Sequence, residues 1–306
     1  MEDVGGKEDN QNKLNGFISN LKPSIKSAPY YFLLPVLSVF CIFMIYPIIK
    51  SFILSFYKFK GGVYEFVGIK NYIALFKDAV FLAGLRNTLI YLIVQVPIMI
   101  LLALILAYLL NQPFLKLKGL FRVSVFLPAV TSLVAYSLVF KLLLNTDYGL
   151  VNYVFRTIGF KAIDWLNSPI GARISLIAAI TWRWTGYNMV ILLAGLQRIP
   201  DEIYEASDID GANRFQKLTK ITIPLMRPII LFCTITSTIG TLQLFDESYI
   251  LTSGGPDNAT ITVAHYLYDT GFRYVKFGYA AAISYVLVVI IAILSFIQFK
   301  VGESED

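Results

Sequence analysis

The sequence contains one histidine and two cysteines among its 306 residues. Cys41 and Cys233 both lie inside apolar segments, which argues against a disulfide framework. His265 is the single histidine, and one histidine without neighbouring cysteines cannot build a common zinc site. We therefore expect no metal site.

Charged residues are also scarce. They make up 15% of the chain, whereas hydrophobic residues make up 57% and the mean hydropathy is +0.66. A water-soluble domain of this length is less apolar, so the composition indicates a membrane protein. The net charge is +6, but the basic residues are scattered through short loops without interleaved aromatic residues, which argues against nucleic-acid binding.

Residues 1–29 form a polar tail. They hold acidic residues as well as lysines, and they lack the basic start and short apolar run of a cleaved signal peptide. We expect this segment to be retained.

Two further absences bear on enzymatic function. The longest connections between apolar segments, around Lys50–Asn87 and Lys141–Arg173, are shorter than 40 residues, which is too short to bury the core of an enzyme domain. A G-x-x-x-x-G-K-[ST] phosphate loop is absent from the sequence. We expect a chain that is not an enzyme, holds no cofactor and receives any ATP-derived energy from a partner.

Six apolar windows follow the polar tail. At about 1.5 Å per residue, a window of roughly 23 residues spans a hydrocarbon core of about 30 Å. Lysine and arginine are split almost evenly between the two sets of loops, so the positive-inside rule does not decide the orientation. The predicted fold is an all-α integral membrane protein with six transmembrane helices, over residues 31–56, 86–110, 121–142, 173–196, 228–251 and 277–299.

A polar insert, Glu202–Pro228, interrupts these windows. Pro200 fits the first position of a helix with an acidic first turn, and Gly211 fits its left-handed C-cap. Asn213 can cap a second short helix, and Pro224 marks the turn into the fifth span. The pattern predicts two amphipathic helices hinged at Gly211. They would either lie at the lipid interface or project into a groove of a partner.

The insert resembles a known loop. The sequences Glu205–Ser207, Asp210–Ala212 and Ile221–Pro224 are similar to the EAA loop of ABC-importer permeases, which reads E-A-A, three residues, G, nine residues and I-x-L-P. Ser207 replaces the second alanine and Ile223 replaces the leucine, and both changes are conservative in size.

In that family the loop is cytoplasmic and docks into a cleft of the ATPase subunit. The resemblance implies that Glu205 contacts the ATPase, that Gly211 sets the angle between the coupling helices, and that both termini are cytoplasmic. It implies a permease domain at 30–300 with a coupling loop at 197–227, between tails at 1–29 and 301–306. The residues implied to couple to the ATPase are Glu205, Ala206, Asp210, Gly211, Phe215 and Pro224.

Further motifs narrow the family. The chain resembles sugar-importer permeases, in particular the maltose-type subunit of the carbohydrate uptake class in its short form. The resemblance implies a second permease subunit, a cytoplasmic ATPase dimer that uses ATP and Mg²⁺, an extracellular solute-binding protein and a cell membrane with its lipid. The segments that carry it are Phe66–Tyr72, Asn87-Thr88, Leu120–Arg122, Leu127-Pro128, Asp147–Asn152, Ala194–Pro200, Phe245-Asp246 and Leu251–Pro256.

A charge inside a membrane span is costly and indicates function. Arg183 lies mid-window in the fourth span between two tryptophans, and amide and hydroxyl residues follow on the fourth and fifth spans. Aromatic faces and such polar groups are typical of a polyol site. Family analogy places the substrate contacts in these parts of both spans. The predicted substrate-binding residues are Trp182, Arg183, Tyr187, Asn188, Ser237, Thr241, Gln243, Phe245 and Asp246.

Arg183 is hypothesised to be neutralised by Asp246. Two alternatives stay open: the tryptophans pack against other helices or lipid, and Arg183 belongs to a structural ion pair. Small residues such as Gly240 also serve close helix packing.

The segment Thr252–Pro256 lies just past the fifth span, and its glycines permit a sharp turn. It is either a generic loop or, by resemblance, a contact for the solute-binding protein through Gly254, Gly255 and Pro256.

The expected function is that of an ABC-importer permease for a sugar or oligosaccharide. The alternative is the same machinery for sn-glycerol 3-phosphate or a uronate-bearing oligosaccharide, because Arg183 is able to meet a phosphate or carboxylate. A membrane-embedded enzyme and a secondary transporter fit less well. The first lacks paired carboxylates or histidines beyond His265, and the second lacks an intramembrane proton or sodium relay.

Overall fold

The computed structural model describes residues 28–60, 62–112 and 115–303. This part of the chain is mostly helical. It divides into two compact units, with the boundary between Leu54 and Ser55. Most of the predicted N-terminal tail and half of the predicted C-terminal tail lie outside the described residues.

The first unit is a helical segment. Helix α2 (Ala28–Phe40) continues through a π-helical turn, Cys41–Ile45, into α3 (Tyr46–Leu54). The run Pro29–Leu54 has 26 residues and is long and apolar enough to cross a membrane. It coincides with the first predicted span.

The second unit begins with a β-hairpin of β1 (Tyr57–Lys60) and β2 (Val63–Phe66). The expectation of an all-α chain missed this hairpin. Tyr57 pairs with Phe66 at 5.3 Å between ring centroids, and Phe59 pairs with Tyr64 at 5.0 Å. Such cross-strand aromatic pairs stabilise a short hairpin.

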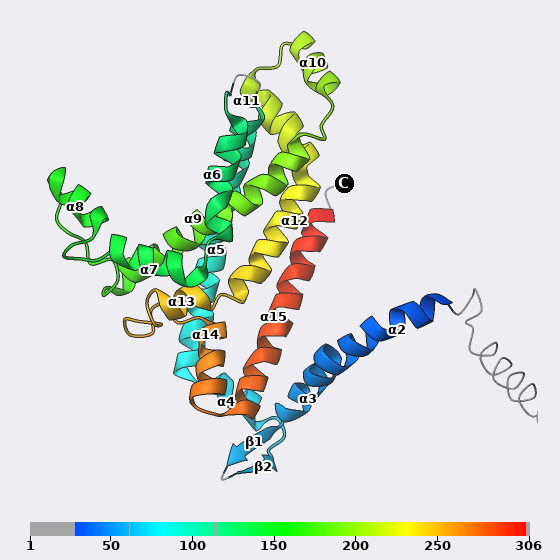
Figure 1. Ribbon diagram of the computed structural model, residues 1–306, viewed down its shortest axis with the longest axis vertical. Coiled ribbons are helices and arrows are strands. Elements are labelled where there is room, and N and C mark those ends of the chain that lie inside the picture. Colours follow the sequence, from blue (N-terminus) through cyan, green and yellow to red (C-terminus); the bar gives the residue numbers. More distant parts are fainter. Residues whose placement is uncertain (1–27, 61, 113–114, 304–306) are drawn as a thin grey trace, which may run out of the picture. The chain divides into compact units, whose positions relative to one another are not determined.

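Four long helices frame the second unit (Figure 1). Helix α5 packs along α9, and α12 packs against α5, α9 and α15. Buried residues of α5, α9 and α12 form one apolar core. The bounds are α5 (Ala79–Asn111), α9 (Pro169–Leu196), α12 (Ile223–Leu242) and α15 (Phe277–Glu303).

The third predicted span, 121–142, is not one straight helix. It divides into α6 (Lys118–Val130) and α7 (Leu133–Leu143), which meet at 98°. Thr131 has extended backbone at the break, and its hydroxyl donates to the carbonyl of Pro128 at 2.7 Å. Helix α6 therefore ends at a cap formed by Thr131, where the sequence had predicted one continuous helix.

Helix α6 lies against α9 through Gly186. A Cβ atom at this position would stand 1.9 Å from the carbonyl oxygen of Val125. Only glycine permits this approach of two backbones, which is how membrane helices pack most closely.

Shorter elements connect the long helices. They are α4 (Lys70–Leu75), α8 (Leu150–Thr157), α10 (Asp201–Ile209), α11 (Arg214–Lys217), α13 (Asp246–Ile250) and α14 (Val263–Tyr268), with π-helical turns at Leu218–Thr222 and Asp269–Arg273.

Within the described residues, five helical runs are long and apolar enough to cross a membrane, and the bent pair α6–α7 makes up to six. The runs are Pro29–Leu54, Ala79–Asn111, Pro169–Leu196, Arg214–Ile250 and Phe277–Gly302.

Candidate functional site

A cavity of about 320 Å³ lies between α5, α9 and α12 and reaches the first turn of α13. Its wall combines aromatic rings with amide, hydroxyl and carboxylate groups, as is usual for a site that takes a small polar ligand. The lining residues are Gln95, Met99, Leu133, Ile180, Trp184, Tyr187, Asn188, Thr236, Ser237, Gly240, Thr241, Gln243, Leu244, Phe245, Asp246 and Glu247.

Helix α9 contributes Asn188, which is buried. Its Nδ2 donates to the carbonyl of Trp184 one turn earlier at 3.1 Å, and its Oδ1 accepts a hydrogen bond from Ser237 of α12 at 3.4 Å. These contacts fix the amide while its neighbours Trp184 and Tyr187 face the cavity with their rings 5.9 Å apart.

Helix α5 contributes Gln95, which the sequence analysis did not select. The hydroxyl of Thr241 donates to Gln95 Oε1 at 3.2 Å, and Gln95 Nε2 lies 3.1 Å from the sulfur of Met99. An amide near the middle of an apolar window was the available signal, since polar side chains inside a span are costly.

Seven of the nine residues predicted to bind substrate line this cavity: Tyr187, Asn188, Ser237, Thr241, Gln243, Phe245 and Asp246. The geometry brings them together, and their role in binding stays a prediction.

Trp182 does not line the cavity. Its ring lies 5.4 Å from that of Phe140 and borders a separate apolar hollow between α5, α6 and α9. Trp184 occupies the cavity wall instead. Two residues turn an α-helix by about 200°, so the two tryptophans face opposite sides.

Arg183 lies behind the wall and is only 5% exposed. Its guanidinium carbon stands 4.7 Å from the ring centroid of Tyr136 and 5.4 Å from that of Trp184, which are cation–π distances. Among the described residues it forms no ion pair with Asp246, contrary to the hypothesis. Arg183 interacts electrostatically with Glu247, the buried neighbour of Asp246.

The polar insert forms a projecting turn. Helix α10 begins at Asp201, one residue later than predicted, and Gly211 follows it with φ +74°. Asn213 caps α11 in a capping box with Gln216, as expected in part from the sequence. Lys217 forms an ion pair with Asp208 across the turn.

The sequence had indicated a separate second helix in the insert, and the structure corrects this prediction. From Arg214 the chain stays helical through the π-helical turn into α12, with Pro224 in the first turn and Pro228 inside the helix. A proline inside a helix removes one backbone hydrogen bond, and the π-helical turn directly before Pro224 is where the hydrogen-bond pattern changes. The six residues implied to couple to an ATPase are all exposed: Glu205, Ala206, Asp210, Gly211, Phe215 and Pro224.

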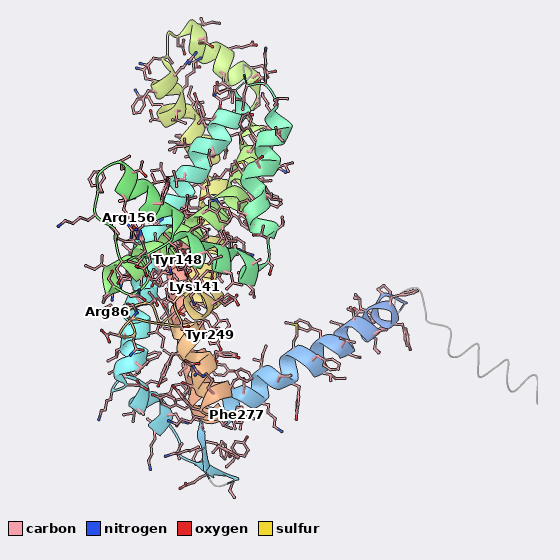
Figure 2. All side chains as sticks on the ribbon, turned by 60° about the vertical axis from the view of Figure 1, so that its left-hand side comes forward. Arg86, Lys141, Tyr148, Arg156, Tyr249 and Phe277 are labelled. Carbon is pink, nitrogen blue, oxygen red and sulfur yellow. The ribbon has the colours of Figure 1, made fainter. Side chains whose placement is uncertain are left out.

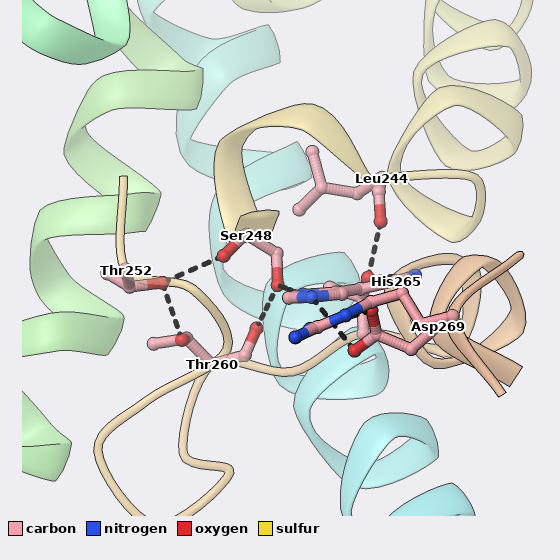
Figure 3. A network of polar contacts seen from close by, with 8 residues as sticks. Leu244, Ser248, Thr252, Thr260, His265 and Asp269 are labelled. Atoms are coloured by element: carbon pink, nitrogen blue, oxygen red, sulfur yellow. Dashed lines mark hydrogen bonds and ion pairs between the residues drawn. The ribbon is translucent and has the colours of Figure 1, made fainter. Parts of the chain in front are cut away.

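A polar network organises the loop 251–262 (Figure 3). Ser248 donates to the carbonyl of Thr260 at 2.7 Å, so its oxygen accepts from His265 Nδ1 at 2.8 Å. Burial lowers the pKa of His265, a shift that Asp269 opposes and Arg273 supports. His265 is therefore neutral at pH 7, with its proton on Nδ1.

The glycines of this loop lie at different depths. Gly254 is buried with φ +78°, and a Cβ there would stand 3.1 Å from the His265 ring, whereas Gly255 and Pro256 are half-buried. The more exposed side chains of the loop are those of Ser253, Asp257 and Asn258. The predicted binding-protein contact is not tested by this geometry.

The loop is also tied to the ends of α5 and α9. Asn87 Nδ2 donates to the carbonyls of Asn258 at 2.8 Å and Ile261 at 3.0 Å. Arg173 Nε donates to the carbonyl of Ala259 at 3.0 Å.

A second hollow of about 490 Å³ lies beside α7 and the same loop. Lys141 and Tyr148 line it, and Figure 2 shows both near Arg156 of α8. Arg156 donates to the carbonyls of Thr146 at 3.0 Å and Asp147 at 3.1 Å, which fixes the connection between α7 and α8.

The chain is similar to the lactose transport system permease protein LacF of Rhizobium radiobacter, with 49% identity over 286 residues, 92% of this chain and 96% of the relative. It is also similar to the arabinooligosaccharides transport system permease protein AraP of Bacillus subtilis strain 168, with 38% identity over 92% of this chain and 90% of the relative.

Solved structures show the same fold. A chain from the crystal structure of a bacterial ABC transporter involved in the import of the acidic polysaccharide alginate has a TM-score of 0.81 at 24% identity, covering 90% of this chain and 95% of that chain. The family model described as binding-protein-dependent transport system inner membrane component matches residues 72–301. With that match over most of its length and a relative at 49% identity, the chain belongs to this family of ABC-importer permease subunits.

Proposed function

We propose that this chain forms part of the membrane pathway by which an ATP-driven importer takes up a neutral sugar or oligosaccharide delivered by an extracellular solute-binding protein. The observation that carries the proposal is the cavity between α5, α9 and α12, where Trp184 and Tyr187 stand beside Asn188 and Ser237. Rings stack on the C–H faces of a sugar, and amide and hydroxyl groups satisfy its hydroxyls. The names of the lactose and arabinooligosaccharide relatives agree with this substrate class.

The charges of the cavity favour a neutral substrate. Asp246 and Glu247 line it, and no lysine or arginine does so in the part of the chain that the structure describes. An anionic ligand would meet like charges in a partly dry site, where their repulsion is strong. Glycerol phosphate and uronate-bearing oligosaccharides are therefore the less favoured substrates.

The exposed turn between α10 and α11 fits the docking element of a cytoplasmic ATPase dimer, which would use ATP and Mg²⁺. Its side chains, including Phe215 at 73% exposure, would enter a groove of that partner. This assignment puts both termini in the cytosol, makes α6–α7 the third of six spans, and adds a second permease subunit to the complex. The loop 251–262 would then face the solute-binding protein outside.

Uptake of radiolabelled sugars by cells that express the complete importer tests the proposal. We expect uptake of a neutral disaccharide such as lactose, or of an arabino-oligosaccharide, to be independent of ionic strength, because no charge pairing is involved. Asn188→Leu should abolish uptake, whereas Ser284→Ala on α15, whose hydroxyl donates to the carbonyl of Ala280 in its own helix, should leave it unchanged. Uptake of glycerol 3-phosphate or a uronate in preference to neutral sugars would overturn the proposal.

A further inference from the structure

Glu247 is a carboxylate in the cavity wall that the sequence did not single out. It lies in the first turn of α13, is 3% exposed and lines the cavity with Trp184 and Thr241. A carboxylate buried to this extent is costly unless a nearby charge or hydrogen bonds compensate for its lost hydration. Its neighbours therefore decide whether it can remain ionised.

Tyr136 and Arg183 offset part of this cost. Helix α13 packs against both α9, which carries Arg183, and α7, which carries Tyr136. The hydroxyl of Tyr136 is placed as a hydrogen-bond donor toward Glu247, and Arg183 adds a smaller electrostatic attraction. Glu247 lines the cavity and Arg183 does not. A substrate in the cavity would therefore contact the carboxylate of Glu247 and not the guanidinium of Arg183.

Donor atoms in this cluster are unused. Within the described chain, Nε and Nη1 of Arg183 are buried without a hydrogen-bond partner. Nη2 of Arg183 makes one long bond, 3.5 Å, to the carbonyl of Ala129. Buried polar atoms are normally paired, so the free donors of Arg183 need an explanation, which a role in holding a carboxylate supplies.

Glu247 is held rigidly from its other side. The next residue, Ser248, is fully buried and bonds to Thr260 and His265 in the network of Figure 3. The carboxylate therefore has little freedom to move away from the cavity, and a binding group on an anchored element is pre-organised.

We infer that Glu247 is a specificity-determining residue whose carboxylate accepts hydrogen bonds from two neighbouring hydroxyl groups of the transported saccharide, with Arg183 and Tyr136 as positioning residues. The inference rests on the proposed sugar transport. A carboxylate only accepts hydrogen bonds, so the substrate must donate both. A sugar that lacks one of these hydroxyls leaves a lone pair of a buried charge unsatisfied and is rejected.

The first experiment compares Glu247→Gln with the wild-type complex in proteoliposomes, using the transported saccharide and its series of monodeoxy analogues. Glutamine keeps the shape but loses the charge and one acceptor oxygen. We expect the variant to take up the parent sugar at least about tenfold less efficiently. We also expect it to lose most of the discrimination against one or two of the analogues. Glu65→Gln, the same change on the exposed strand β2, is the matched control and should keep both values.

The second experiment tests the positioning residue. Arg183→Gln leaves the Glu247 carboxylate buried without its counter-charge, so we expect this variant to assemble poorly. Combining it with Glu247→Gln should restore assembly, measured as the yield of complex, and the double variant should show the relaxed selectivity of Glu247→Gln alone. Yield and selectivity together distinguish two explanations: either Arg183 holds the Glu247 carboxylate in place, or the two residues stabilise the fold independently.

The outcomes are distinct. Unchanged discrimination in Glu247→Gln overturns the inference, and so does a double variant that assembles no better than Arg183→Gln. Sugar uptake by the wild-type complex leaves the proposed function intact in either case. Failure of the wild-type complex to transport any neutral saccharide overturns the proposed function itself.

Discussion

Lys217 and Asp208 form an ion pair that bridges the turn at Gly211. A second link joins the same two helical segments, because the hydroxyls of Tyr204 and Thr222 lie 3.0 Å apart. The angle between α10 and the helix that leads into α12 is thus fixed by contacts on both sides of a glycine in the left-handed region. This rigidity suits an element that transmits force.

The turn predicts a difference between two substitutions of Gly211. Gly211→Val should be strained by about 1–2 kcal/mol because a β-branched residue disfavours positive φ, whereas Gly211→Asn should be tolerated because asparagine enters that region more readily. We expect sugar-stimulated ATP hydrolysis by the complete importer to fall in the first variant and to persist in the second. Equal activity in both would contradict a role for the fixed angle.

Glu205 is exposed on α10 and is predicted to contact the ATPase. Glu205→Lys should abolish co-purification of the ATPase, because reversing a charge at an interface replaces attraction with repulsion. Membrane insertion should be unchanged, measured as the amount of permease in the membrane fraction. An undiminished yield of ATPase would exclude Glu205 from the interface.

His265 predicts acid sensitivity. Its pKa is lowered in the folded chain, first by burial, so the unfolded chain binds more protons and stability falls as pH drops below its ordinary value of about 6.5. The slope is at most about 1.4 kcal/mol per pH unit. Thermal unfolding of the purified complex between pH 5 and 8 measures it. His265→Gln should lower stability at pH 7 and flatten this part of the profile, and an unflattened profile would assign the titration to another group.

Asp78 joins three elements at one end of the second unit. It caps α5, and its Oδ2 accepts from the hydroxyls of Tyr266 at 2.6 Å and Tyr279 at 2.8 Å. Burial raises its pKa, but these hydrogen bonds outweigh burial and lower the pKa overall. Its stabilisation is thus present above the ordinary value of about 3.9 and is lost as pH falls below it.

Asp78→Ala should cost about 2 kcal/mol or more, since it removes a cap and leaves two tyrosine hydroxyls without their acceptor. Tyr279→Phe removes one of the same bonds, so its effect should nearly vanish in the Asp78→Ala background. Additive losses in thermal unfolding would show that the two groups act separately.

Gly186 predicts a packing defect. Gly186→Ala places a Cβ where the backbone of Val125 stands, so α6 and α9 must separate at a cost of about 1–3 kcal/mol. Gly119→Ala in α6 is the matched control, because nothing lies within 4 Å of a Cβ there. We expect a lower unfolding midpoint for the first variant only.

Much of this architecture follows from the sequence. Long apolar runs with few charges form helices in a bilayer because a helix pairs its own backbone groups, so the apolar windows predict α5, α9 and α15. The left-handed turn at Gly211 and the helix cap at Asn213 depend only on residues close in sequence, so they are also predictable from it.

Other features depend on distant parts of the chain. The bend between α6 and α7 could not be predicted, because the same window is apolar on both sides of Thr131. The wall residues Gln95, Trp184 and Glu247 emerge only when α5, α9 and α13 are packed together. For the same reason Arg183 was assigned to Asp246, whereas the fold buries the neighbouring acid beside it.

The hydrogen bonds from Asn87 and Arg173 to the loop 251–262 decide which of its residues can be substituted without detaching the loop. Both side chains donate hydrogen bonds to backbone carbonyls, which every amino acid supplies. The exposed side chains of Asp257 and Asn258 take no part in these bonds. If the loop meets the solute-binding protein, as proposed, substitutions of Asp257 and Asn258 can suit a different binding protein while the hydrogen bonds that hold the loop remain.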